Sequence, residues 1–238
     1  PQETRLLLLL DYAEREGSDK ALDMVQTTVD NMLNGGIHDH VGGGFHRYAT
    51  DRQWHVPHFE KMLYNQGLMT SVLARLYART EQQRYKRAIN RLVNFLDRHM
   101  RDDNGAFYSA LNAETDAVEG AYYVWRDDKL KHILGQHYDF FMQYHSLEGL
   151  PHHAGQKNPD GKVLVRDQQP RSTAKRRRID SLLASLLDER GKRKRPSLDD
   201  KILTAWNGMM IFSLAEAGRI LDNQAYIRRA EKAAAFIT

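Results

Sequence analysis

The chain has 238 residues, of which 41% are hydrophobic and 28% are charged, and it contains no cysteine. This composition excludes a disordered chain, and the lack of cysteine excludes disulfides, a cysteine nucleophile and thiolate metal sites. The longest apolar run, Leu6 to Leu10, is far shorter than the roughly 18 residues that a membrane span requires, so no membrane contact is expected. The absence of cysteine favours a cytoplasmic location. Helical patterns reach both ends of the sequence, which predicts a single domain over residues 1–238 that is truncated at both ends.

The net charge is modest, 35 − 31 = +4, but basic residues crowd two short runs, at 171–178 and 190–195. Such runs can bind nucleic acid. These two flank a short amphipathic segment, 179–187, and are interpreted more simply as solvated helix ends. Nucleic acid is therefore not an expected partner.

Apolar residues recur at steps of three and four along much of the chain, which predicts helices joined by short turns. Ser18 is placed to cap the first clear helix, and Asn34-Gly35 supplies a left-handed stop. Pro57 suits the first position of the next helix. A further apolar stripe from Tyr85 to His99 predicts the helix after it.

Two stretches interrupt the helical pattern. Turn residues precede Phe107-Tyr108 and the aromatic run 122–125, which predicts two short strands within 101–125. The stretch 146–170 is rich in Gly, Pro, Asn and Asp, and we interpret it as loop.

An internal repeat carries most of the architectural information. Glu60-Lys61-Met62-Leu63 resembles Asp200-Lys201-Ile202-Leu203, and the match continues at a constant offset of 141 from Gly67/Gly208 to Phe95/Phe236. Repeated helix pairs must stack to bury their apolar stripes, either as an open solenoid or as a closed ring. Because the related units are separated by strands and long loops, the ring is favoured. The predicted fold is all-α, a partial (α/α)6 toroid with a small β-hairpin insertion near residues 105–125.

The segment 35–48 holds five glycines and three histidines, His38, His40 and His46, which is typical of a shaped loop and not of a helix or strand. It is followed by further polar and aromatic candidates, Trp54, His55, His58 and Glu60. If Pro57 opens a helix, His58 and Glu60 lie in its first turn, beside the loop.

Two interpretations of this cluster stay open. The histidines and Arg47 either tie the loop to helix ends through hydrogen bonds, or they transfer protons near neutral pH. The histidines fit no established ligand spacing, so no metal is expected, and nothing predicts a cofactor. The repeat brings a second set of residues towards the same region: Asp199, Asp200, Trp206 and Asn207.

Three strings of residues resemble the spermatogenesis-associated protein 20 family: 38–48, 54–64 and 198–208. That family resembles a thioredoxin-like domain followed by a six-hairpin toroid, similar to N-acylglucosamine 2-epimerases and six-hairpin glycosidases. The resemblance implies an upstream thioredoxin-like domain in the intact protein. The chain departs from the family pattern at 150–162, so nothing functional is carried over there.

The leading hypothesis is a carbohydrate-active domain, a sugar epimerase or isomerase or a glycoside hydrolase, that binds a sugar or sugar derivative in a central cavity. Its acid/base candidates are His40, His58, Glu60 and Asp200. Trp54 and Trp206 would stack on the sugar, Arg47 and Asn207 would orient it, and the remaining substrate-binding candidates are His38, His46, His55 and Asp199. The alternative is a non-catalytic platform that serves the thioredoxin-like domain or a protein partner.

Overall fold

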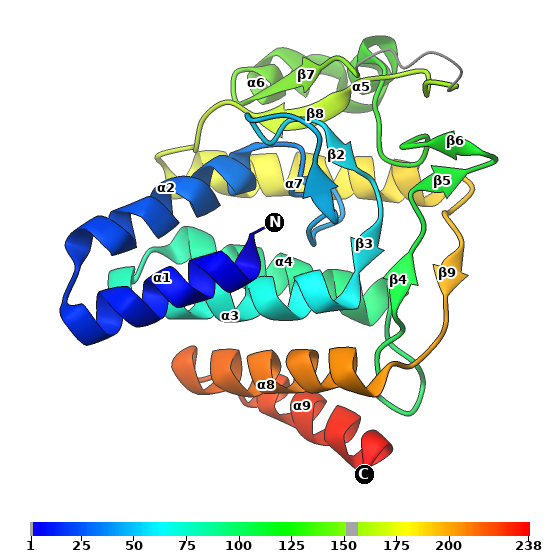
Figure 1. Cartoon of the computed structure of the whole chain (residues 1–238). Coiled ribbons are helices and arrows are strands. Elements are labelled where there is room, and N and C mark those ends of the chain that lie inside the picture. The colour runs from blue at the N-terminus through cyan, green and yellow to red at the C-terminus, as the bar shows by residue number, and fades with distance from the viewer. Residues whose placement is uncertain (1, 151–156) are drawn as a thin grey trace.

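The computed structural model describes residues 2–150 and 157–238 and is mostly helical (Figure 1). Its helices include three hairpins, α1 (Glu3–Glu16) with α2 (Asp19–Asn34), α3 (Leu63–Thr80) with α4 (Gln83–His99), and α8 (Thr204–Ile220) with α9 (Gln224–Ile237). The first helices of the hairpins form a row, because α1 packs on α3 and α3 packs on α8. Residues of all three hairpins contribute to one large apolar core.

The helix boundaries only partly follow the sequence prediction. Ser18 caps α2 as expected, because its hydroxyl accepts the backbone N–H of Ala21 at 3.3 Å. Gly35 is not a left-handed stop, since its φ is −70°. The prediction that Pro57 opens a helix is wrong: Pro57 lies in a strand and α3 begins at Leu63. His58 and Glu60 therefore do not occupy a helix turn.

The internal repeat is visible in two equivalent amide side chains, one on α3 and one on α8, that each bind the backbone of a phenylalanine. Gln66, near the start of α3, accepts the N–H of Phe45 at 2.8 Å and donates to its carbonyl at 2.7 Å. Asn207, at the offset of 141, brackets Phe107 in the same way, at 2.8 and 2.9 Å. Gly67 follows Gln66 and allows the close approach of α8, since a Cβ there would lie 3.2 Å from the backbone nitrogen of Met210.

Short strands gather where α3 and α8 begin. The strands β3 (Lys61–Met62), β4 (Ala110–Leu111) and β9 (Leu198–Asp199) form one antiparallel sheet in the order β3-β4-β9. Three two-stranded pairs surround it: β1 (Tyr48–Ala49) with β2 (Pro57–His58), β5 (Glu114–Thr115) with β6 (Val118–Glu119), and β7 (His145–Glu148) with β8 (Val163–Arg166).

These strands correct two predictions and confirm a third. The β5–β6 pair is the predicted hairpin insertion near 105–125, but neither 107–108 nor 122–125 forms a ladder; Phe107 and Trp125 make only isolated bridges. The stretch 146–170 is not all loop, because it holds most of β7 and all of β8. Residues 151–156 of that stretch lie outside the described residues.

A second apolar core lies under α5 (Asp127–Leu134), η1 (Gly135–His137), α6 (Tyr138–Met142) and α7 (Thr173–Gly191). The two basic runs lie at the ends of α7, as expected. The interpretation of both runs as solvated is wrong for one residue, since Arg190 is only 2% exposed. None of the described helices is long and apolar enough to cross a membrane.

Candidate functional site

Asp39 is the centre of the glycine-rich loop. Its Oδ1 accepts the backbone N–H groups of Val41 and Gly42, which closes a tight turn. Arg190 of α7 binds both carboxylate oxygens at 2.9 Å, and Lys61 of β3 donates to Oδ2 at 2.7 Å. Burial alone would raise the pKa of Asp39, but Arg190 and Lys61 outweigh it and hold the pKa well below its usual range. The loop is therefore fixed by a buried carboxylate that stays ionised.

Cations also hold the carbonyl groups of this loop. Arg91 donates to the carbonyl of His40, Arg98 to that of Gly42, and Lys61 to that of Gly43 at 2.7 Å. Burial lowers the pKa of Lys61 to about 8, while Asp39 opposes that shift. Gly43 has a φ of +82°, and a Cβ there would lie 2.3 Å from a backbone oxygen of α4. Only glycine fits such an approach.

The three loop histidines are buried. His40 directs Nε2 to the carbonyl oxygens of Asn34 and Gly35 at 3.1 and 3.0 Å, and His46 directs Nδ1 to that of Phe59 at 3.0 Å. Burial lowers the pKa of His46 to about 3 and holds those of His38 and His40 well below the ordinary value. All three are neutral near pH 7, and the contacts of His40 and His46 tie the loop to its surroundings.

His58 lies in a different environment, at the surface. Its Nδ1 is 2.7 Å from Oε1 of Glu119, its Nε2 is 3.1 Å from Oε2 of Glu60, and the ring of Tyr48 stacks on it at 4.9 Å. Arg47 donates to Glu60 at 2.8 Å, and this hydrogen bond raises the pKa of Arg47. The side chain of His58 is 23% exposed and that of Glu60 is 26% exposed. We call Arg47, Tyr48, His58, Glu60 and Glu119 the His58 cluster.

The β1–β2 pair explains how this cluster forms. Tyr48 and His58 are directly opposite in the ladder, so their rings meet on one face. Glu119 comes from β6 and also accepts the N–H of Phe59 at 3.2 Å. Two strand pairs that are distant in sequence thus meet at one imidazole.

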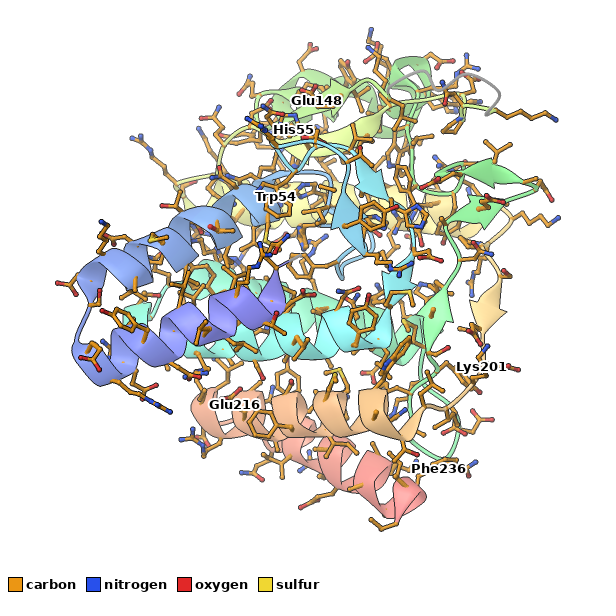
Figure 2. The ribbon with its side chains drawn as sticks, in the orientation of Figure 1. Trp54, His55, Glu148, Lys201, Glu216 and Phe236 are labelled. Atoms are coloured by element: carbon orange, nitrogen blue, oxygen red, sulfur yellow. The ribbon has the colours of Figure 1, made fainter. Side chains whose placement is uncertain are left out.

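Trp54 and His55 lie on the connection that leads to β2, away from the His58 cluster contacts. Trp54 adopts φ +64° and packs against the main core, and its carbonyl accepts the N–H of Ile37 at 3.0 Å. Figure 2 shows His55 beside Glu148 of β7, and Nδ1 of His55 is 3.9 Å from Oε2 of Glu148.

The residues predicted from the repeat are also separated from His58. Asp199 pairs with Lys201 at 2.7 Å, and Asp200 is exposed. The indole of Trp206 meets Tyr64 edge-on at 5.0 Å. Asn207 is fully buried and its amide is occupied by the backbone of Phe107. The strand β4 lies between β3, which follows Glu60, and β9, which holds Asp199.

Sequence reasoning missed Tyr48, Lys61, Glu119 and Arg190 as members of these clusters. Lys61 could have been noticed, because a lysine between Glu60 and an apolar helix start recurs in the repeat. Nothing in the sequence connects Glu119 with His58 or Arg190 with Asp39. Among residues 2–150 and 157–238, no three His, Asp or Glu side chains converge so as to hold a metal ion.

A family model described as N-acylglucosamine 2-epimerase (GlcNAc 2-epimerase) matches residues 3–135, more than half of the chain. The chain belongs to the N-acylglucosamine 2-epimerase family. Spermatogenesis-associated protein 20 of Homo sapiens is 32% identical over 258 residues, which cover 96% of this chain and 33% of that protein. The uncharacterized protein B0495.5 of Caenorhabditis elegans is also 32% identical, over 100% of this chain and 37% of its own length. These matches confirm the resemblance stated above, and the chain spans about a third of the relatives' length.

Two solved structures support the fold. A family 76 glycoside hydrolase from a bovine Bacteroides thetaiotaomicron strain superposes with a TM-score of 0.56 at 12% identity, covering 97% of this chain and 33% of that one. A family 76 glycoside hydrolase (mannosidase) from Bacteroides thetaiotaomicron VPI-5482 gives 0.54 at 11% identity, covering 98% and 41%. With these neighbours, the prediction of an all-α, partial (α/α)6 toroid is confirmed.

Proposed function

We propose that this chain is part of a carbohydrate-active domain, of the sugar epimerase or isomerase type or of the glycoside hydrolase type, and that His58 and Glu60 are its acid/base pair. The observation that carries the proposal is the His58 cluster. A partly exposed imidazole lies between two carboxylates, one of which is held by Arg47. Family membership supports a sugar as the ligand.

The geometry of the cluster suits proton transfer. Each ring nitrogen of His58 faces a carboxylate oxygen, that of Glu60 at 3.1 Å and that of Glu119 at 2.7 Å, so a proton on the imidazole can be shared with a carboxylate. The cluster then holds a proton that His58 can donate to a substrate oxygen, while a carboxylate accepts one from carbon or water. Arg47 donates a hydrogen bond to Glu60 at 2.8 Å and holds its carboxylate in position. Such division between acid and base serves both epimerisation next to a carbonyl and glycoside hydrolysis.

The other predicted residues enter the proposal unequally. Asp200 is exposed, and Trp206 is partly exposed on the same stretch, so both remain available to a sugar. Trp54 and His55 flank the cluster in sequence, and Asp199 lies beside Asp200. The burial of His38, His40, His46 and Asn207 favours a supporting role, in which they hold the loop and the neighbouring turn in place.

A second candidate is the non-catalytic platform, with the thioredoxin-like domain or another protein as its partner. It is favoured by two of the buried loop histidines, His40 and His46, whose contacts are those of structural anchors. It predicts that no sugar reacts and that loss of His58 changes nothing but local stability.

The test is a sugar panel incubated with the protein in D2O and followed by NMR. An epimerase or isomerase exchanges the hydrogen next to the sugar carbonyl for deuterium, and a glycosidase releases a new reducing end. His58→Gln should abolish either signal, whereas His132→Gln, the same substitution at an exposed histidine of α5, should keep it. If the panel gives no exchange, no cleavage and no binding, the platform is the better description.

A further inference from the structure

A pocket of about 140 Å³ lies on the side of the β3-β4-β9 sheet that faces away from Asp199. Lys61, Leu111 and Leu198 are opposite one another across the three strands and all line this pocket. Met62, Ala110 and Asp199 form the next row, and successive residues of a strand point to opposite faces. None of the residues of the His58 cluster lines this pocket.

The lining of the pocket is strongly cationic. Four cations contribute to it, Lys61, Arg98, Arg190 and Arg195, against one carboxylate, Asp39, which gives an excess of 4 − 1 = +3. His99 also lines the pocket, but burial lowers its pKa to about 4, so it adds no charge near neutral pH.

Loop anchoring accounts for three of these cations, whereas the fourth, Arg195, is exposed to solvent and free to bind a ligand. Lys61 and Arg190 bind Asp39, and Arg98 binds the carbonyl of Gly42. Arg195 makes no hydrogen bond or ion pair within the described part of the chain, although it lines the same pocket. Tyr123 lines it too, and its buried hydroxyl has no partner among the described residues.

The exposed guanidinium of Arg195, the buried hydroxyl of Tyr123 without a partner among the described residues, and two buried cations that share one carboxylate together form a site suited to an anion from solvent. The two buried cations, Lys61 and Arg190, exceed Asp39 by 2 − 1 = +1, and Arg98 and Arg195, which are both exposed, add two more positive charges to the same pocket. Because the excess is three and not one, a dianion matches it better than a carboxylate. Arginine also binds phosphate with two parallel N–H donors.

We propose that this pocket binds the phosphate group of a small molecule, with Arg195 and Tyr123 as its direct donors and with Lys61 and Arg190 supplying the field from the pocket's base. Phe95, Leu111 and Leu198 provide the apolar wall on which the remainder of the molecule lies. The site is independent of the proposed sugar chemistry, since it uses none of the His58 cluster.

The test is isothermal titration calorimetry of the whole chain with inorganic phosphate at constant ionic strength. Phosphate should bind, and Arg195→Gln should weaken that binding about tenfold, since a hydrogen bond between charged groups is lost. The matched control is Arg177→Gln, which removes one charge from an exposed, unpaired arginine of α7 and should change nothing. Tyr123→Phe should weaken binding as well while the protein remains folded.

Three outcomes overturn the proposal. Phosphate does not bind, Arg177→Gln weakens binding as much as Arg195→Gln does, or acetate binds as tightly as phosphate. The second would reduce the effect to general surface charge, and the third would make the pocket a carboxylate site. None of these results bears on deuterium exchange at the His58 cluster, so the two proposals fail separately.

Discussion

Replacement of Asp39 by asparagine should destabilise the protein more than removal of either cation that binds it. The buried group contains one carboxylate, Asp39, and two cations, Lys61 and Arg190, with side-chain exposures between 1% and 5%. Asp39→Asn leaves both cations without a counter-charge and weakens the acceptor for two backbone N–H groups. Lys61→Met leaves Asp39 bound by both nitrogens of Arg190.

The magnitude follows from the cost of an unpaired buried charge. Breaking a buried ion pair by removing one partner costs about 3–5 kcal/mol. The pKa of Lys61 is lowered to about 8, so this amine can lose its proton at modest cost once Asp39 is gone, whereas Arg190 cannot. The loss for Asp39→Asn should therefore lie near the lower end, about 3 kcal/mol. Lys61→Met should cost about 1–2 kcal/mol, chiefly for the unpaired carbonyl of Gly43.

The assay is urea unfolding at pH 7, followed by circular dichroism, for the wild type, Asp39→Asn, Lys61→Met and Arg190→Met. The free energy of unfolding should fall most for Asp39→Asn, with the slope against urea unchanged. A cost for Asp39→Asn that is equal to or below that of Lys61→Met would refute the view that this carboxylate compensates two cations.

Three further predictions concern the supporting structure. Burial lowers the pKa of His46 and of His145 to about 3. Below pH 6.5 the unfolded chain therefore binds more protons than the folded chain, and the free energy of unfolding should fall as the pH drops from 6.5 towards 3. The expected loss is about 2 kcal/mol per histidine at pH 5. Urea unfolding between pH 7 and 5 should show a shallower fall for His145→Phe; an unchanged fall would argue against a neutral buried imidazole. Gly43→Ala should lower the free energy of unfolding by about 2 kcal/mol or more, because the new Cβ meets backbone and the residue has a positive φ. Gly149→Ala, whose Cβ would have no neighbour within 4 Å, should leave urea unfolding unchanged. Asn207→Ala should lower the free energy of unfolding by about 2–4 kcal/mol, because the buried N–H and carbonyl of Phe107 lose their partner. A loss below about 1 kcal/mol would contradict a stabilising role for these two hydrogen bonds.

The helical part of the fold could be predicted because its signals are local. The apolar stripes, the Ser18 cap and the offset of 141 are all readable along the chain, and helices dominate the structure. The start of α3 could not be predicted from Pro57 alone, since pairing of β2 with β1 competes with helix formation at that residue. Strand pairing depends on distant partners, which propensity does not see.

The sequence offered candidate site residues but could not predict their contacts. The sequence indicated the loop 35–48 and the residues up to Glu60, and the structure places both around one region. It could not indicate that Asp39 meets Arg190 across 151 positions or that His58 meets Glu119 across 61. Which histidines are buried follows from those long-range contacts. The extent of the domain and the upstream thioredoxin-like domain stay predictions.

The most direct test of the central claim is a sugar titration followed through the histidine side-chain signals in ¹H–¹⁵N NMR, with His58→Gln and His55→Gln used to assign two of them. We expect that a sugar which binds will shift the His58 signals and leave those of the buried His40 and His46 unchanged. A sugar that binds while the His58 signals stay fixed, or that shifts only the buried histidines, would contradict it.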